Sequence, residues 1–236
     1  MDFLSANGQI VPVEMRRRKK TRYIRLTIGH KNQIVASVPW HINERSVGKF
    51  IEKQKFWLDG QLSKVPPIYT LTEWLDLHPL ITASGNVFKV RIEAIEPCKP
   101  SYTLDQCKGV LVLRLSNADD ASLVKLLRRF AKDTLTCRVA YHAKRFRLSY
   151  HATSIRDQSS RWGSCSARRC ISLNWRLILL RPELQDHIIL HELAHLTEMN
   201  HDKGFRTLLD RYDPHCLIHE VAIDKISAGL MRVARL

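Results

Sequence analysis

The sequence predicts an α+β fold in which an N-terminal antiparallel β-rich part precedes a part where helices pack beside a small mixed sheet. One observation is the strand-like alternation of apolar and polar residues, which dominates residues 9–38 and returns at residues 87–115. Another is helical periodicity, which marks residues 119–144 and the segment that begins at Pro182. Strands therefore dominate the first part of the chain and helices the second, which is an α+β arrangement.

The N-terminal elements are separated by recognisable turns and breaks. An antiparallel meander is the simplest arrangement for three strands whose last two are joined by a turn at residues 29–32. These strands are expected at residues 9–14, 23–28 and 33–38. After Pro39, a helix is expected from residue 43 to about residue 62, and Pro66 with Pro67 then breaks the chain.

The composition changes again in the middle of the chain. The segment from Asn117 to Asp120 resembles a helix cap, and a long helix is expected from there to about Lys144. We place a soft domain boundary at this point. It divides the chain into an N-terminal β-rich region with one helix, residues 1–118, and a C-terminal domain, residues 119–236.

Two strand-like segments at residues 147–155 and 170–175 are expected to pair, with residues 160–166 between them. An edge strand in this region would leave backbone groups free to hold an extended substrate by adding it to the sheet. Trp162 would suit such an edge as an aromatic wall, and Gly163 would allow a close backbone approach. The alternative is a simple hairpin turn.

Length and composition are those of a globular protein. Apolar residues make up 44% of the 236 residues, and charged residues make up 26%. The first residues lack the basic and apolar regions of a secretory signal, and no apolar run approaches the roughly 18 residues that a membrane span needs. The six cysteines form no C-x-x-C pair, so we expect free thiols in a reducing compartment. We therefore expect a cytoplasmic protein with no membrane partner.

The formal net charge of +15 is the strongest compositional feature. Such a balance favours association with nucleic acid or other polyanions through counterion release, whereas a solvated basic face is the simpler alternative. The basic block from Arg16 to Lys20 is the best isolated candidate for a phosphate contact, and we expect it in an exposed loop between two strands. Nucleic acid is therefore a candidate partner.

The chemistry of the chain is concentrated in residues 187–205. His191 and His195 stand four apart, so on a helix they would present their imidazoles to one point. His201 is the natural third ligand, because catalytic zinc sites use three protein ligands and leave one position for water. Glu192 lies about 100° round the helix from His191 and is the candidate general base. The sequence therefore predicts a zinc site with three histidine ligands and one catalytic glutamate.

The residues around this motif support a helix and contain one departure from a known pattern. Arg181–Glu183 reads as a helix start, since proline is tolerated in the first turn and an acid there favours the helix dipole. The histidine spacing matches the H-E-x-x-H-x-x-G-x-x-H pattern of metzincins, but Glu198 replaces the glycine. Asn200, which tolerates left-handed backbone, could provide the turn that returns His201 to the helix. The alternative is an amphipathic helix with surface histidines.

Four sequence blocks occur in the order and spacing of a known family. They are Arg161–Ser166, Ile171–Ile178, His191–Leu196, and Met199–His201 followed by Phe205. On these blocks the C-terminal half resembles the YgjP-like metallohydrolases. Residues 23–26 and the helix that ends near Trp57 resemble the N-terminal region of the same family. The likeness therefore covers most of the chain, and residues 66–118 match it least.

This resemblance implies a zinc-dependent, zincin-like catalytic domain that is distantly similar to the SprT-like and WLM proteases. Those proteases act on proteins associated with DNA, which would give the basic charge of this chain a meaning. The family is described as metallopeptidases, and nucleotide pyrophosphatase activity has been associated with some members. The resemblance therefore leaves the substrate open between a protein or peptide and a nucleotide.

The leading hypothesis is a zinc metallopeptidase in which a metal-bound water, activated by Glu192, hydrolyses a peptide bond. The oxyanion donor is left open among Tyr150, Arg161, Arg176 and His187. One alternative is a metal-dependent nucleoside triphosphate pyrophosphohydrolase. Against it, no glycine-rich phosphate loop is evident, and three histidines favour zinc over magnesium. The other alternative is a basic nucleic-acid-binding module with a structural metal, which would not need Glu192.

Overall fold

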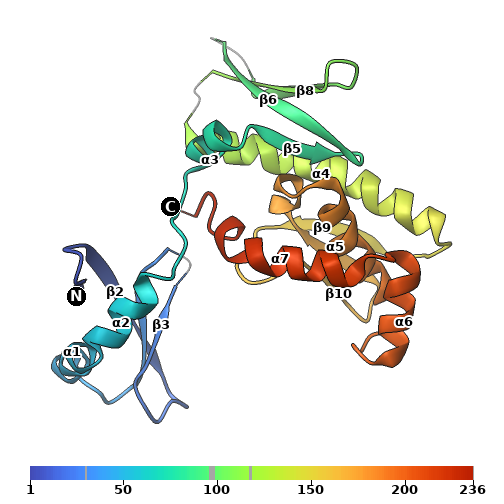
Figure 1. Cartoon of the computed structure of the whole chain (residues 1–236). Helices are drawn as coiled ribbons and strands as arrows, with labels where there is room; N and C mark the ends of the chain where they lie inside the picture. Colours follow the sequence, from blue (N-terminus) through green and yellow to red (C-terminus); the bar gives the residue numbers. More distant parts are fainter. Residues whose placement is uncertain (30, 96–98, 117–118, 236) are drawn as a thin grey trace. The chain divides into compact units, whose positions relative to one another are not determined.

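The computed structural model of the chain consists of two compact units (Figure 1). The described residues are 1–29, 31–95, 99–116 and 119–235. The first unit comprises Met1–Ile68, to which Arg235 also belongs, and the second comprises Tyr69–Ala234. Each unit has a hydrophobic core of its own, so each is described by itself.

The division between the units lies at Ile68, directly after the two prolines that were expected to break the chain. The soft boundary predicted at residue 118, with Asn117 of the expected cap, falls outside the described residues. Strands that precede this point share one core with the helix that follows it, through Leu111 and Leu113 on one side and Phe130 on the other. The boundary at residue 118 therefore stays a sequence prediction, whereas the structure divides at Ile68.

The first unit is a four-stranded sheet with two helices on one face. The elements are β1 (Asp2–Leu4), β2 (Ile10–Arg18), β3 (Arg25–Ile28), β4 (Ile34–Pro39), α1 (Glu44–Lys53) and α2 (Lys55–Leu62). Val47 of α1 and Leu58 of α2 are buried against a sheet face that includes Leu26 and Ala36. The expected helix from residue 43 is confirmed as two consecutive helices, and the Asn43 side chain caps the first of them.

The predicted antiparallel meander is wrong in one pairing. The strand order is β1-β2-β4-β3; β3 and β4 pair antiparallel as expected, but β2 and β4 pair in parallel. The basic block explains the difference, because Arg16–Arg18 continue β2 instead of forming a loop. The alternation that places Val13 and Met15 toward the core runs on into the block. The chain therefore continues beyond the position where a hairpin would turn, and β3 pairs with β4 on the side opposite to β2.

In the second unit, α4 (Asp120–Arg145) lies between two sheets (Figure 1). The first sheet contains β5 (Leu80–Ala83), β6 (Asn86–Ala94), β7 (Ser101–Asp105) and β8 (Val110–Leu115), in the order β5-β6-β8-β7. The helix packs against β7 and β8 on one side and against β9 (Ala152–Arg156) and α5 (Pro182–Ala194) on the other. Its predicted start is confirmed at Asp119, whose side chain accepts a hydrogen bond from the Ser122 backbone N–H at 2.9 Å.

One helix of the second unit was not predicted. α3 (Leu71–Leu77) begins after Thr70, whose side chain accepts a hydrogen bond from the Glu73 backbone N–H, while the Glu73 carboxylate accepts one from the Thr70 N–H. This reciprocal arrangement is a capping box. The Thr-x-x-Glu spacing was therefore a local signal that could have revealed the helix.

The second sheet of this unit confirms the small mixed sheet expected beside the helix with the histidines. It consists of β9 (Ala152–Arg156), β10 (Gly163–Cys165) and β11 (Cys170–Asn174), in the order β10-β11-β9. β11 pairs in parallel with β9 and antiparallel with β10, so β10 is an edge strand. A 3-10 helix (Trp175–Leu179) then leads into α5 (Pro182–Ala194), α6 (Lys203–Tyr212) and α7 (Cys216–Leu230).

The expected aromatic wall at Trp162 is wrong. Its side chain is only 8% exposed, belongs to the core of the unit, and donates a hydrogen bond from Nε1 to Ser227 Oγ of α7 at 2.7 Å. A large ring with one polar atom is most stable when the ring is buried and the N–H is satisfied. Trp162 therefore anchors the start of β10 and does not line its open edge.

The described residues bear on two expectations, the lack of a membrane span and the free thiols. Within them, no helix combines the length and the apolar character that a membrane crossing requires. The five described cysteines are all free thiols, as expected. Cys98 lies outside the described residues.

Asp186 of α5 is held by two basic side chains of α4. Its carboxylate lies 2.7 Å from Arg138 Nε and 3.0 Å from His142 Nε2. Burial works to raise the pKa of Asp186, but the hydrogen bonds from Arg138 and His142 outweigh it and lower the pKa. Asp186→Asn should lower the unfolding free energy by about 3 kcal/mol at neutral pH, because it leaves a largely buried positive charge unpaired.

Urea denaturation at a series of pH values tests this role of Asp186. A carboxyl with a lowered folded-state pKa stabilises the fold above its unfolded pKa of about 3.9, and this contribution is lost as the pH falls through the folded pKa. The stability difference between wild type and variant should therefore shrink below about pH 4. The exposed Asp224→Asn is the matched control. A difference that stays constant into acid would contradict the ion-pair explanation.

Candidate metal centre

The end of α5 carries the first three residues of the predicted site. The helix starts as expected, with Pro182 in its first turn, and His195 is its C-cap residue. His191 and Glu192 lie in the last turn. The rings of His191 and His195 have centroids 5.0 Å apart, because residues four apart share one face of a helix.

His201 returns to the same point by a route that differs from the prediction. Its ring centroid lies 5.2 Å from that of His191 and 4.7 Å from that of His195. Asn200 is not among the described residues with a positive φ, so the expected left-handed turn is not formed there. Instead, Asp202 starts α6 by accepting a hydrogen bond from a backbone N–H of the first turn at 3.2 Å. The chain turns before His201, where the backbone N–H groups of Thr197 and Glu198 both donate to the Ala194 carbonyl at 3.0 Å.

The three imidazoles are spaced as ligands of one tetrahedral ion would be. Nε2 of His191 and Nε2 of His201 are 3.2 Å apart, and ligand atoms of all three histidines lie within 4.8 Å of one another. Two nitrogens bonded to one tetrahedral zinc at 2.0–2.1 Å are roughly 3.3–3.4 Å apart. His195 Nδ1 lies 3.0 Å from the Glu198 carbonyl, and donation from Nδ1–H there leaves Nε2 free as a ligand atom. The donor set therefore fits zinc.

The electrostatics of the cluster favour the neutral form of the imidazoles. Burial lowers the pKa of His191 to about 3, and the proximity of His195 and His201 adds to the shift. Burial also lowers the pKa of His195. Neutral imidazole is the form that coordinates a metal. At neutral pH these two side chains are therefore in the state that a cation requires.

One aromatic ring supports all three imidazoles. Phe205 of α6 is fully buried, and its ring centroid lies 5.0 Å from His191, 4.5 Å from His195 and 4.7 Å from His201. Its ring is stacked on His195 and meets the other two edge to face. In the sequence Phe205 stands out only as part of a family block, and its contact with the three imidazoles depends on the fold.

Glu192 is buried beside the histidines with one oxygen free. The residue is only 5% exposed, and within the described part of the chain no group donates a hydrogen bond to its Oε2. Burial raises the pKa of Glu192 to about 8, and the positive charge of Arg161 opposes that shift. Burying a carboxyl oxygen without a hydrogen-bond partner lowers the stability of the fold. A functional role for Glu192 would account for such an oxygen.

Gly163 of β10 makes room for the Glu192 side chain. A Cβ atom at position 163 would lie 2.5 Å from Glu192 Oε1 and 2.6 Å from Glu192 Cγ, which is closer than atoms can approach. The close approach that the structure shows at Gly163 is to Glu192, and the predicted approach of a substrate to this edge stays a prediction. The contact with Glu192 places the edge strand directly against the glutamate.

Gly163→Ala should displace the Glu192 carboxyl and, if Glu192 is the general base that the sequence predicts, lower the rate of hydrolysis. We expect a loss of about 10²-fold, since misplacement of a catalytic group by about 1 Å can cost that much. Metal content should be unchanged, because the new methyl group meets Glu192 and none of the three histidines. Gly60→Ala, at a position with open space and no positive φ, is the control for a glycine replacement. Full activity in Gly163→Ala would contradict the tight fit.

A single pocket joins the helix and the edge strand. Its volume is about 250 Å³, and its lining residues are Gly163, Ser164, Cys165, His191, Glu192, His195, Met199 and His201. All four predicted site residues thus face the same space as the three residues of β10. An extended chain in this pocket would lie beside free backbone groups of an edge strand.

Two of the four candidates for an oxyanion donor are committed elsewhere. Arg176 is fully buried and donates hydrogen bonds to Asp157 and to the Val233 carbonyl. The His187 ring is buried and faces Asp213. Tyr150 packs against the core. Arg161 is exposed, and its positive charge acts on the Glu192 carboxyl.

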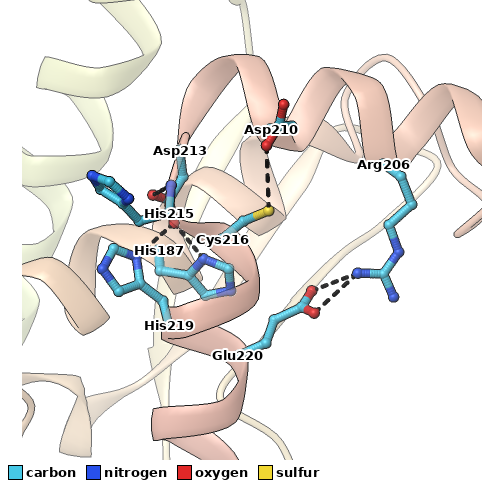
Figure 2. Close-up of polar contacts among 8 residues, drawn as sticks. All are labelled: His187, Arg206, Asp210, Asp213, His215, Cys216, His219 and Glu220. Carbon is cyan, nitrogen blue, oxygen red and sulfur yellow. Dashed lines mark hydrogen bonds and ion pairs between the residues drawn. The ribbon is translucent and has the colours of Figure 1, made fainter.

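A second polar cluster includes His187, one helical turn before His191 (Figure 2). His187 Nδ1 and His219 Nδ1 lie 2.6 Å and 2.8 Å from the same oxygen of Asp213, and the His215 backbone N–H donates to the other oxygen. Burial works to raise the pKa of Asp213, but the hydrogen bonds from His219 and His187 outweigh it and lower the pKa. These distances are those of a hydrogen-bonded cluster that ties α5 to α7. Neither His219 nor Asp213 was singled out from the sequence.

Comparison with known proteins identifies one family. The model of the YgjP-like family, metallopeptidase domain, matches residues 22–225. No curated protein and no solved structure is significantly similar to the chain. The matched range contains all four residues of the site, together with β10 and the ring of Phe205.

Proposed function

Because the chain belongs to the YgjP-like family of metallopeptidase domains, we propose that it is a zinc-dependent peptidase. His191, His195 and His201 would hold the ion, and Glu192 would act as general base. The observation that carries the proposal is the pocket in which these side chains face the free edge of β10. A metal-dependent peptidase is the activity that the family match supports.

The residues fit a catalytic ion better than a structural one. Structural zinc sites use four protein ligands, whereas three histidines leave a position open toward the pocket. Bound zinc supplies Lewis acidity, which polarises a carbonyl oxygen and makes a neighbouring water more acidic. A nearby cation would also favour the charged form of Glu192 and counteract the effect of burial on its pKa.

Glu192 would transfer protons, and β10 would orient the substrate. Glu192 Oε2, which has no partner among the described groups, would accept a proton from the attacking water and return it to the leaving amine. The backbone of Gly163–Cys165 would pair with an extended peptide and orient its scissile bond over the histidines. Arg161 would donate to the oxyanion of the transition state. These two roles would account for the position of the Glu192 carboxyl directly beside the free edge of β10.

A substrate panel tests the proposal with the full-length, zinc-loaded protein. Unfolded protein and fluorogenic peptides should be cleaved, cleavage should stop with a chelator, and it should return when zinc is restored. The same samples should leave nucleoside triphosphates intact. Release of pyrophosphate without peptide cleavage would overturn the peptidase assignment in favour of the pyrophosphohydrolase alternative. Cleavage that survives the chelator would overturn the role of the metal.

A further inference from the structure

The first unit carries an arginine-lined hollow on the sheet face opposite its helices. The hollow has a volume of about 690 Å³. It is lined by Arg16, Arg18, Thr21, Arg22, Tyr23, Ile24, Arg25, Thr27, Val35 and Ser37. Four of these residues are exposed arginines, and none is acidic. The peptidase chemistry proposed above makes no use of this surface.

The strand register explains why the surface is hollow. Arg16 of β2 and Arg25 of β3 both stand opposite Ser37 of the central strand β4. The small side chain of Ser37 therefore forms a floor between two walls of arginine. Since neighbouring strands are about 4.8 Å apart, the two walls are separated by about 10 Å. The residues next along the strands, such as Met15 and Ala36, face the core instead.

Most of the positive charge in this hollow is available to a ligand. Arg16 lies 2.6 Å from Glu14 and is partly neutralised by it. In the part of the chain that the structure describes, Arg18, Arg22 and Arg25 make no ion pair. A chain with a formal net charge of +15 thus concentrates unpaired guanidinium groups around one concave surface. Guanidinium groups favour phosphate oxygens, because their planar donors match that geometry.

We propose that this hollow, formed by Arg16, Arg18, Arg22 and Arg25 with Tyr23, binds single-stranded nucleic acid. Residues two apart on one strand, such as Arg16 and Arg18, are about 6.6 Å apart and can contact successive phosphates. Tyr23 is 81% exposed at the hollow and offers a ring on which an unpaired base can stack. The separation of about 10 Å between the walls suits one strand better than a duplex, whose major groove alone is about 12 Å wide.

Fluorescence anisotropy with the full chain and labelled single-stranded RNA and DNA of mixed sequence tests the proposal. The triple variant Arg18→Glu, Arg22→Glu, Arg25→Glu should bind about tenfold or more weakly, and the slope of log K against log salt should fall in magnitude by about 2. The matched control is Lys49→Glu, Lys53→Glu, Lys55→Glu, which makes the same charge change at exposed positions on the helices of this unit. It should bind nearly as well as the wild type. Equal loss of binding in both triple variants would overturn the location.

Tyr23→Ala separates base stacking from general attraction to anions. It should weaken single-strand binding about fivefold or more, while Tyr23→Phe should retain the wild-type affinity. A duplex of the same sequence, phosphatidylserine vesicles and polyglutamate should bind less tightly at the same ionic strength. Equal binding of any of these probes, or no effect of Tyr23→Ala, would overturn the assignment to a single strand. Because binding is measured without peptide hydrolysis, failure here would leave the proposed peptidase function untouched.

Discussion

Glu192→Gln should hydrolyse peptides roughly 10²–10⁴-fold more slowly than the wild type, which is the usual contribution of a general base. Glutamine preserves the shape of the side chain but cannot accept a proton at neutral pH. The buried, unpartnered Oε2 has no other described group to satisfy it, so the loss should appear in kcat. The measurement is steady-state hydrolysis of a fluorogenic peptide by the zinc-loaded variant.

The control for Glu192→Gln is Glu183→Gln in the first turn of the same helix. Glu183 pairs with the exposed Arg181 at 3.1 Å, about two helical turns before His191, so its replacement should leave kcat unchanged. Zinc content should equal that of the wild type in both variants, because neither change touches an imidazole. A Glu192→Gln enzyme with zinc bound and wild-type kcat would contradict the general-base role.

Phe205→Ala should lower the unfolding free energy by about 3–5 kcal/mol, because the side chain is fully buried and its removal leaves a cavity. The same change should weaken zinc binding, because the ring contacts all three imidazoles and limits their rotation. We expect a 10–100-fold loss of zinc affinity, as is typical when support of a metal ligand is removed. Urea denaturation and competition with a zinc indicator measure the two effects.

Phe146→Ala is the matched control for Phe205. Phe146 packs against Tyr212 in the same hydrophobic cluster, with ring centroids 4.3 Å apart. Its replacement should destabilise the fold and leave zinc affinity close to that of the wild type. Equal loss of zinc affinity in the two variants would mean that general loosening, and not contact with the imidazoles, is responsible.

Local patterns in the sequence were enough to locate the helix and its polar residues. His191, Glu192 and His195 follow from helical spacing, which depends only on positions a few residues apart. The cap at Asp119 and the edge strand near Gly163 also follow from neighbouring residues. The sequence thus predicted which side chains would converge, and their roles as ligands and base stay proposals.

Local patterns could not predict contacts between residues that are far apart in the sequence. Asp213 reaches His187 across 26 positions, and no periodicity joins two residues so far apart. Trp162 faces inward because α7, the last helix of the second unit, covers it through Ser227. The parallel pairing of β2 with β4 likewise depends on how the chain returns between distant strands, which the local alternation of Met15 and its neighbours does not specify.

Zinc content of the purified protein tests the account most directly. Elemental analysis should find about one zinc ion per chain in the wild type and much less in His191→Ala, His195→Ala and His201→Ala. His151→Ala, at an exposed position outside the cluster, should retain the wild-type content. His201 is the decisive position, because it alone reaches the site from beyond the helix. If His201→Ala binds zinc as fully and as tightly as the wild type, the three-histidine centre is contradicted.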